Sequence, residues 1–295
     1  MLPVLLLLLV IEILLRQIPN DYRFKKEYLD KHASEVEILI LGSSHAFFGF
    51  NPIYFKQPAF NLSHISQSLN YDYALFDLYK TKFIKLKTIV VPISYFTLYD
   101  RLEDSSESWR VKNYILYYGT GNPTSVRDYS EILSNRFDLN IDRLSAYYVL
   151  HVPNISCNNL GWGTNYKSNN AQNLLETGRT AAIRHTKDIK SSKGVGTYNA
   201  NVGILKSIIR WGETHHVNVI LVTPPAFETY RQNLDLEQLD NTIETATELA
   251  ARYDNCTYVN LLNDTNFIAK DYYDADHLSE IGSKKLSLLI QRYLY

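Results

Sequence analysis

Five short apolar runs constrain the fold of this chain more than any other feature. They span residues 36–41, 59–62, 88–93, 217–222 and 256–261. The first run shows no polar alternation over 38–41, which predicts a strand buried on both faces, and the runs at 88–93 and 217–222 also predict buried strands. The runs at 59–62 and 256–261 predict two further strands. Amphipathic segments that predict helices follow or separate these runs, at residues 66–83, 202–214, 234–253 and 278–293. This alternation predicts a parallel sheet with helices on both sides.

The first run stops at a glycine and two serines, in the order Leu41-Gly42-Ser43-Ser44. Gly42 predicts a tight turn, and a serine after it would lie at the carboxyl end of a central strand. Open α/β sheets bind their ligands at that edge. Glycine and serine are also ordinary turn and helix N-cap residues, so this segment alone fits a structural role as well as a catalytic one.

A segment near the other end of the chain supplies the groups that a catalytic serine needs. Asp274 precedes His277 by three residues, at the start of the predicted last helix. A serine nucleophile needs a base to take its proton, and the base needs a carboxylate to orient it. Asp276 is the competing carboxylate, but it is adjacent to His277 in sequence and we expect its side chain to point elsewhere.

These two segments together resemble the SGNH (GDSL-type) hydrolase superfamily. More narrowly, they resemble its membrane-anchored branch, which includes proteins of D-alanine transfer to teichoic acid and of polysaccharide O-acetylation. The resemblance covers residues 36–295 in block order, and the first and last blocks match closely. It implies a flavodoxin-like three-layer α/β sandwich with a five-stranded parallel sheet of order 2-1-3-4-5. It also implies Ser44 as nucleophile, His277 as general base and Asp274 as the orienting carboxylate.

The resemblance further implies donors for an oxyanion, which an acyl-transfer site requires. The first is the backbone N–H of Ser44. The second comes from a family glycine five residues beyond an asparagine, and counting from Asn61 places Ser66 there. The third is an asparagine that this chain lacks after its third strand. The Ser94 hydroxyl, Tyr95 or the Gln67 amide must then replace it, or the donor is absent.

Three more residues are candidates for contact with the substrate. His45 and His64 lie on loops at the predicted carboxyl edge of the sheet, and Tyr95 follows the third strand. Each histidine could line a pocket or be a satisfied structural residue. The other histidines are scattered without metal-ligand spacing, and we expect them at the surface or at helix ends.

Residues 98–198 interrupt the alternation of strands and helices. No strong strand signal appears there, so we expect a mostly helical insertion over the active-site face. Trp109, Trp162 and Tyr166 are candidate sugar-stacking residues, and the alternative is a small packed subdomain without ligand contact. The expected organisation is therefore a membrane anchor or uncleaved signal segment at residues 1–20, followed by an SGNH-like domain at 33–295.

The aliphatic stretch from Leu2 to Leu15 is interrupted by Pro3 and Glu12. It is shorter than the roughly 20 residues of a membrane-spanning helix, so it could be a signal-peptide core, a buried helix or a span whose beginning lies earlier. No small-residue cleavage site follows, which favours an uncleaved anchor. The basic residues after it disfavour export, so the expected extracytoplasmic location rests on the resemblance.

The formal net charge is −1, and no basic patch with interleaved aromatic residues is present, which disfavours nucleic acid as a partner. Cys157 and Cys256 lie far apart without CxxC or Cys/His spacing, so we expect no metal and no cofactor, and leave a disulfide open.

We therefore expect a serine esterase or acyltransferase that acts on a small acyl ester, such as an O-acetyl group, of a cell-surface carbohydrate. Expected partners are an acylated carbohydrate or cell-wall polymer, a membrane acyltransferase, and the membrane itself through residues 2–15. The alternative is a non-catalytic carbohydrate-binding or scaffold partner of a membrane acyltransferase. A third reading is a cytoplasmic esterase with a buried amino-terminal helix.

Overall fold

The computed structural model describes residues 2–294, which form two compact units. Unit 1 combines the amino-terminal residues up to Lys31 with Leu102–Ser156. Unit 2 combines His32–Arg101 with the rest of the chain from Cys157 onward. The sheet and the residues of the predicted catalytic site all belong to unit 2.

The sheet of unit 2 is entirely parallel, and its strands have the order β2-β1-β3-β4-β5. The strands are β1 (Ile38–Ile40), β2 (Ala59–Asn61), β3 (Thr88–Pro92), β4 (Asn218–Thr223) and β5 (Cys256–Asn260). This confirms the predicted α/β class, the number of strands and their order. Every residue of β1, β2 and β3 is buried, which explains why these segments show no polar alternation.

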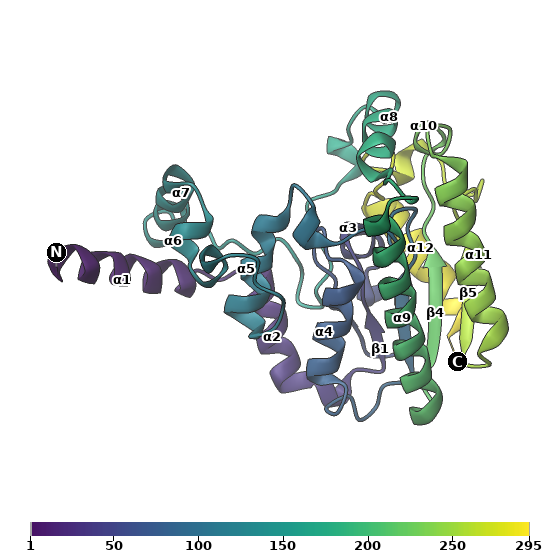
Figure 1. Cartoon of the computed structure of the whole chain (residues 1–295), viewed down its shortest axis with the longest axis horizontal. Helices are drawn as coiled ribbons and strands as arrows, with labels where there is room; N and C mark the ends of the chain where they lie inside the picture. The colour runs from purple at the N-terminus through teal and green to yellow at the C-terminus, as the bar shows by residue number, and fades with distance from the viewer. Residues whose placement is uncertain (1, 295) are drawn as a thin grey trace. The chain divides into compact units, whose positions relative to one another are not determined.

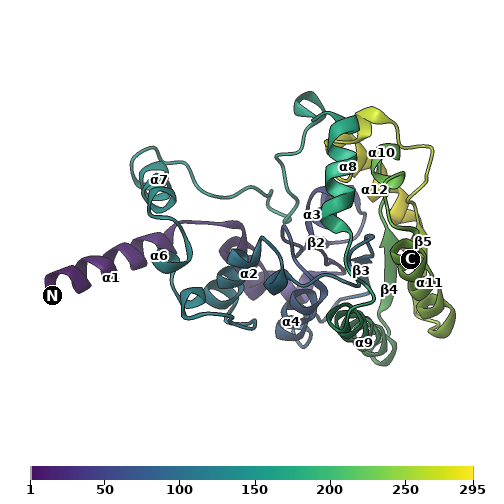
Figure 2. The ribbon, with the colours of Figure 1, turned by 45° about the horizontal axis from the view of Figure 1, so that its top comes forward.

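Helices cover both faces of this sheet (Figures 1 and 2). One face carries α4 (Leu69–Tyr79), α9 (Ser192–His215) and α11 (Leu236–Arg252), and the other carries α3 (Ser44–Gly49) and α12 (Glu280–Ile290). The remaining helices of unit 2 are α8 (Leu174–His185) and α10 (Glu228–Arg231), which pack on each other. The core beneath α3 and α12 combines strand and helix residues, among them Ile38, Ile40, Val90, Ile220, Val222, Leu286 and Ile290.

The turn after β1 depends on Gly42. Its φ of +114° lies in a region that residues with a side chain rarely adopt. A Cβ atom at this position would lie 3.1 Å from Ala46 Cβ and 3.1 Å from Pro92 Cδ. The turn leads to Ser43 as the N-cap of α3 and to Ser44 as its first residue. Ser44 therefore lies at the carboxyl edge of the central strand.

Two predicted helices differ from the observed ones at their amino-terminal ends. The helix predicted from residue 66 begins at Leu69, because Ser66 has a φ of +60° and Ser68 is the N-cap. The helix predicted from residue 202 begins ten residues earlier, at Ser192. Ser191 caps it, since its Oγ accepts a hydrogen bond from the Gly194 N–H at 3.0 Å.

Unit 1 is built from helices that come from two separate parts of the sequence. They are α1 (Leu2–Gln17), α2 (Asp21–His32, up to Lys31), α5 (Val111–Asn113), α6 (Glu131–Ser134) and α7 (Phe137–Tyr148), with a π-helical turn at Tyr114–Tyr118. Among residues 2–294, no helix has both the length and the apolar character needed to cross a membrane.

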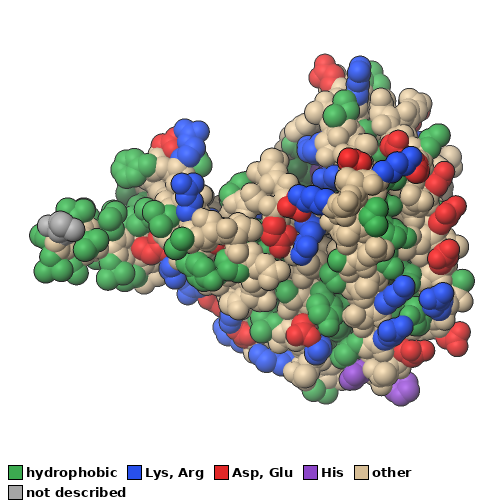
Figure 3. Space-filling view, viewed as in Figure 1, with side chains coloured by type: hydrophobic (Ala, Val, Ile, Leu, Met, Phe, Trp, Pro, Cys, Tyr) green, Lys and Arg blue, Asp and Glu red, His purple; other side chains and the backbone are tan. Residues whose placement is uncertain are grey.

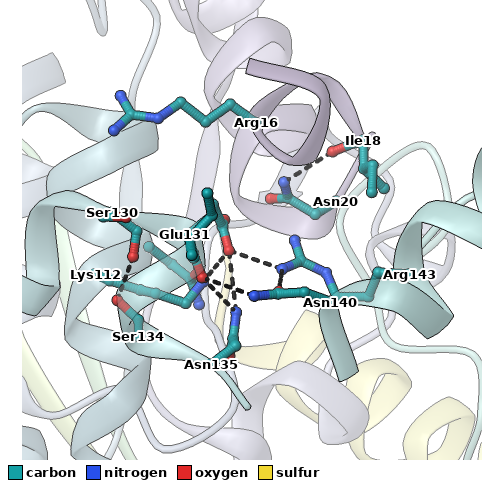
Figure 4. A network of polar contacts seen from close by, with 12 residues as sticks. Arg16, Ile18, Asn20, Lys112, Ser130, Glu131, Ser134, Asn135, Asn140 and Arg143 are labelled. Atoms are coloured by element: carbon teal, nitrogen blue, oxygen red, sulfur yellow. Dashed lines mark hydrogen bonds and ion pairs between the residues drawn. The ribbon is translucent and has the colours of Figure 1, made fainter. Parts of the chain in front are cut away.

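A buried ionic network surrounds Glu131 in unit 1 (Figure 4). The carboxylate is fully buried, and its Oε2 accepts from Lys112 Nζ at 2.8 Å and from Arg143 Nη1 at 2.8 Å. Its Oε1 accepts from the Tyr117 hydroxyl at 2.5 Å. Burial opposes the charge, but Lys112 and Arg143 outweigh it and lower the pKa of Glu131 to about 2.

Replacement of Glu131 by glutamine is expected to destabilise unit 1. The substitution leaves the buried Lys112 and the partly buried Arg143 without their carboxylate, and loss of one partner of a buried pair typically costs about 3–5 kcal/mol. Denaturant unfolding of the full chain measures this loss. The matched control is Glu107→Gln, which removes a partly exposed pair with Arg110 and should cost less, about 1 kcal/mol. Equal losses in the two variants would contradict the importance of the buried network.

The pH dependence of unfolding gives a second measure of the same network. Because the folded pKa of Glu131 is depressed, its stabilising effect is complete above the ordinary pKa near 4.5 and is lost as pH falls toward about 2. We therefore expect the Glu131→Gln variant to lose less stability than the wild type between these pH values.

Candidate active site

Three side chains from opposite ends of the chain form a connected relay in unit 2. Ser44 Oγ lies 2.8 Å from His277 Nε2. His277 Nδ1 lies 2.9 Å from Asp274 Oδ1 and 3.1 Å from Asp274 Oδ2. The structure thus brings together the three residues that the resemblance implies as nucleophile, base and orienting carboxylate.

The loop before α12 folds back on itself and fixes the imidazole. The Tyr273 N–H donates to the His277 carbonyl at 2.9 Å, and Tyr272 pairs with Leu278 across the loop. Asp274 Oδ1 also accepts from the His277 N–H at 2.8 Å. One carboxylate therefore holds both the backbone and the ring of His277. This local bonding explains how a spacing of three residues produces the contact.

Burial differs among the three side chains of the relay. His277 is 7% exposed and Asp274 is 9% exposed, whereas Ser44 is only partly buried. The hydroxyl is thus the part of the relay that an external molecule can reach. A nucleophile needs this access, and its base and orienting group do not.

Asp276 lies at the centre of a second buried group. Its Oδ2 lies 3.2 Å from His45 Nε2, 3.5 Å from His277 Nδ1 and 3.6 Å from Arg184 Nη2. The expectation that Asp276 points away from His277 is wrong, because the folded-back loop turns neighbouring side chains toward the same ring. Asp274 remains the nearer carboxylate to His277 Nδ1, by 2.9 Å against 3.5 Å.

The charge state of His277 is set by these carboxylates. Burial of the ring lowers its pKa, but the charges of Asp276 and then Asp274 outweigh burial and raise the pKa to about 9. The pKa of Asp276 is held well below its usual range, because His277 and His45 overcome the effect of its own burial. At neutral pH the resting site therefore contains an imidazolium beside two carboxylates.

His45 and Ser94 extend this arrangement on the far side of Asp276. Burial lowers the pKa of His45 despite its bond to Asp276, so the ring is neutral. Its Nε2–H donates a hydrogen bond to the Asp276 carboxylate. Its Nδ1 lies 2.7 Å from Ser94 Oγ and accepts a hydrogen bond from the serine hydroxyl. Ser94 therefore directs its hydroxyl proton at His45, so this hydroxyl is not free to donate to an oxyanion.

Comparison with known proteins finds no matching family model and no matching curated protein. Solved structures do resemble the chain. The sequence identity to each of them is low. A protein provisionally named a platelet activating factor from Streptococcus pneumoniae is 15% identical, with 100% of this chain and 99% of that chain covered and a TM-score of 0.43.

Two Bacteroides structures are similar at a comparable level. A provisionally named acylhydrolase from Bacteroides fragilis is 12% identical, with 91% of this chain and 94% of that chain covered and a TM-score of 0.42. A GDSL-like lipase from Bacteroides thetaiotaomicron is 12% identical, with coverages of 92% and 97% and a TM-score of 0.41. Similarity at this level says nothing about the chemistry of the site.

The loop after β2 contains two of the predicted oxyanion donors. Ser66 adopts the left-handed conformation that favours glycine, at the position where the family carries glycine. Gln67 donates from Nε2 to Asp72 Oδ1 at 2.6 Å, and the same oxygen accepts from the Gly42 N–H at 2.6 Å. Burial raises the pKa of Asp72 to about 7 against both bonds. Asp72 thus ties this loop to the turn that carries Ser44.

The predicted substrate contacts His64 and Tyr95 are both buried. His64 is 2% exposed in the loop after β2. The Tyr95 hydroxyl lies 2.9 Å from Thr186 Oγ1 and accepts from the Asp235 N–H at 3.1 Å, so its ring packs beneath α8 and α11. Both side chains therefore lie inside the protein, away from the surface that a substrate would contact.

The candidate sugar-stacking residues have their rings engaged by protein groups. Tyr166 stacks between Phe48 and Tyr273, with ring centroids 3.6 Å and 3.8 Å away, so both of its faces are covered. Trp162 is 6% exposed and donates to the Phe48 carbonyl at 2.8 Å. Trp109 lies in unit 1 with the Arg110 guanidinium over its ring. The Tyr166 ring also packs edge-on against the His277 ring, with the two ring centroids 5.3 Å apart.

Two residues near the site, His185 and Arg184, carried no motif that could have identified them. His185, the last residue of α8, has Nδ1 2.9 Å from the Tyr230 hydroxyl and 3.9 Å from Asp276 Oδ2. Burial holds the pKa of His185 well below its usual range. Arg184 precedes it and faces Asp276. His185 does end a helix, as expected, but it also forms part of the site wall.

His45, Asp276 and His277 are the one set of side chains among residues 2–294 whose spacing would suit a metal ion, with potential ligand atoms within 4.8 Å of one another. Their ring nitrogens are already hydrogen-bonded to carboxylates, and Arg184 faces the same carboxylate. Each of these three side chains therefore already has protein partners in the structure.

Proposed function

We propose that this chain is a serine esterase or acyltransferase of SGNH type. The observation that carries the proposal is the 2.8 Å contact between Ser44 Oγ and His277 Nε2, continued by Asp274 on the other ring nitrogen. Hydroxyl, imidazole and carboxylate in this order form the arrangement of a serine nucleophile with its base and orienting group.

In the proposed reaction, neutral His277 accepts the Ser44 hydroxyl proton at Nε2 while Oγ attacks the ester carbonyl carbon. The tetrahedral intermediate collapses, the alkoxide leaves, and His277 returns the proton to it as an alcohol. An acyl-serine remains. Water or a carbohydrate hydroxyl then gives its proton to His277 and attacks the acyl carbon, which releases an acid or a new ester and restores Ser44.

Two backbone groups are proposed as oxyanion donors. Ser44 is the first residue of α3, and the first amides of a helix have no partner within it. The Ser66 amide is the second, since its left-handed backbone reproduces what a glycine would adopt. The third donor, which the resembling family takes from an asparagine, has no equivalent in this mechanism. Loss of one oxyanion donor typically lowers kcat by about a hundredfold or more, so we expect a kcat lower by that factor than that of an enzyme with all three donors.

The proposed substrate is a small acyl ester, such as an O-acetyl group, on a cell-surface carbohydrate, with α1 holding the protein at the membrane and the catalytic unit outside the cytoplasm. The resemblance of the first and last blocks supports this choice. The test is release of acetate from p-nitrophenyl acetate and from an O-acetylated polysaccharide, with transfer to an added glycan measured in parallel. Binding of the glycan without release or transfer of acetate would favour the non-catalytic scaffold.

The pH dependence of the reaction follows from the raised pKa of His277. Only neutral imidazole can accept the serine proton, so kcat/KM should rise with pH and level off above about 9. Asp276→Asn removes the larger of the two charges that raise this pKa. We expect the midpoint of the profile to move to lower pH by about one unit or more. Initial rates on p-nitrophenyl acetate between pH 6 and 10, a range chosen to bracket the midpoint, measure the shift.

The control for this shift is Asp77→Asn, which removes an exposed carboxylate paired with Lys80 on α4. Its profile should coincide with that of the wild type. A wild-type profile that is flat from pH 6 upward would contradict an imidazolium resting state, whereas an unshifted midpoint in Asp276→Asn would show that Asp276 does not set the pKa.

A further inference from the structure

The first part of α1, residues 2–11, is an unusual helical segment. Residues 2–11 contain no polar side chain. The seven consecutive residues from Val4 to Val10 are each between 43% and 60% exposed. Successive residues of a helix point about 100° apart, so the exposed apolar surface surrounds α1 on every side. Figure 3 shows apolar side chains along the length of this helix.

Such a surface fits hydrocarbon better than a protein groove. A helix that binds in a groove is amphipathic, because its outer face stays in water. A helix that is apolar all round is stable only where apolar material surrounds it, and its backbone groups are already hydrogen-bonded internally. The lipid bilayer provides this environment, which agrees with the anchor proposed above.

A second apolar surface of unit 1 lies on residues 126–152. We call it the 126–152 patch, and its ten members are each at least 39% exposed: Val126, Tyr129, Leu133, Phe137, Leu139, Ile141, Tyr148, Val149, Leu150 and Val152. Three of them, Phe137, Ile141 and Tyr148, lie on one stripe of α7 with a spacing typical of an amphipathic helix. Exposed apolar patches of this extent mark interaction sites.

Hydrogen bonds fasten this patch to α1 directly after its apolar stretch. Glu12 caps α6, since its carboxylate accepts from the Glu131 N–H at 2.9 Å and the Ile132 N–H at 3.0 Å. Arg16 donates from Nη2 to the Tyr129 carbonyl at 2.6 Å, and the Tyr148 hydroxyl donates to the Leu14 carbonyl at 3.0 Å. The patch is therefore fixed at the level where α1 changes from apolar to polar residues.

The charges at this level match the headgroup layer of a bilayer. An open groove is lined by Arg16, Arg23 and Lys26, with Glu27 as its one acidic residue. Each cation also pairs with a carboxylate on its own helix. Cations placed just beyond an apolar segment can reach lipid phosphates while their aliphatic stems stay in apolar surroundings.

We propose that the 126–152 patch is a second membrane-contacting surface, which lies in the interface of the bilayer that α1 enters. The occupant is a phospholipid surface. The contact adds an interfacial area to the helix and orients unit 1 with α7 along the membrane plane. This proposal is independent of the catalytic function, and it assigns residues 126–152 to the membrane instead of to a lid over Ser44.

The test uses the full chain reconstituted into phosphatidylcholine vesicles that contain a photoactivatable phospholipid. Peptide mapping after illumination should find lipid adducts within residues 2–15 and within 126–152. Leu236 of unit 2 is 71% exposed on α11, and its peptide serves as the exposed apolar comparison, which should carry no adduct. Adducts on 2–15 without adducts on 126–152 would overturn the proposal.

A matched pair of variants tests the same contact. Phe137→Asp with Ile141→Asp should reduce labelling of 126–152 by about tenfold or more, because burial of a Phe side chain alone favours binding by that order. Leu236→Asp should leave labelling unchanged. Both variants are compared with the wild type in kcat/KM on p-nitrophenyl acetate and in thermal unfolding. Reduced kcat/KM in the double variant with normal lipid labelling and unfolding would assign the patch to a lid, against the proposal.

Discussion

Replacement of Ser44 by alanine is expected to lower kcat on p-nitrophenyl acetate by at least about 10⁴-fold. The Ser44 hydroxyl contacts His277 Nε2 and carries the acyl group in the proposed reaction, so the variant cannot form the acyl-enzyme. A serine-reactive fluorophosphonate should label the wild type once per chain and leave the variant unlabelled. Binding of an acylated carbohydrate should persist, since the substitution removes one oxygen and no positive charge.

The neighbouring serine provides the control. Ser43→Ala removes the same oxygen one residue earlier, from an N-cap whose side chain makes no capping hydrogen bond. We expect its kcat to stay within a few-fold of the wild type and its labelling to be normal. If Ser43→Ala is inactive while Ser44→Ala still reacts, the nucleophile is misassigned. If both variants and the wild type fail to react, the non-catalytic scaffold is the better function.

The centre of the sheet was predictable from the sequence because its strands are buried on both faces. Ile38–Ile40 and Thr88–Pro92 have neighbouring strands and covering helices, so every position is buried and all but Thr88 are apolar. Helix starts were less predictable, because they depend on single residues. Ser66 carries a good capping side chain, but its positive φ delays α4 until Leu69.

The wider site was only partly predictable, because its contacts join distant residues. His185 lies 91 positions before Asp276 and carries no local motif, so only the packed structure shows that the two face each other. Asp276 was expected to point away since consecutive side chains usually diverge. The hydrogen bond from the Tyr273 N–H to the His277 carbonyl closes the loop and cancels that divergence.

The grouping of residues 102–156 with the amino terminus could not be predicted from periodicity. Glu12 interrupts an aliphatic stretch, and the sequence alone does not show what its carboxylate binds. In the structure it caps α6, with the Ser130 hydroxyl donating to it at 2.8 Å. One acidic residue thus joins segments more than a hundred positions apart, and a window-based interpretation sees it only as a break in an apolar run.

Replacement of Asp274 by asparagine is expected to lower kcat by roughly 10⁴-fold while leaving fluorophosphonate-accessible Ser44 in place. Asp274 Oδ1 accepts from both His277 Nδ1 at 2.9 Å and the His277 N–H at 2.8 Å. The amide oxygen can take the place of Oδ1, but an N–H₂ group then replaces Oδ2, which lies 3.1 Å from His277 Nδ1. An N–H₂ group can only donate to that nitrogen, and this favours the tautomer with the proton on Nε2. That tautomer cannot take the Ser44 proton.

Asp276→Asn separates this effect from a general loss of negative charge. Both variants remove one carboxylate near the same ring, but Asp276 Oδ2 lies 3.5 Å from His277 Nδ1, the longer of the two distances. Asp276→Asn should therefore keep a kcat within about tenfold of the wild type at its own pH optimum and shift only the profile. If Asp276→Asn loses activity and Asp274→Asn retains it, Asp276 is the orienting carboxylate. Asp274 would then serve the loop backbone, through its bond to the His277 N–H.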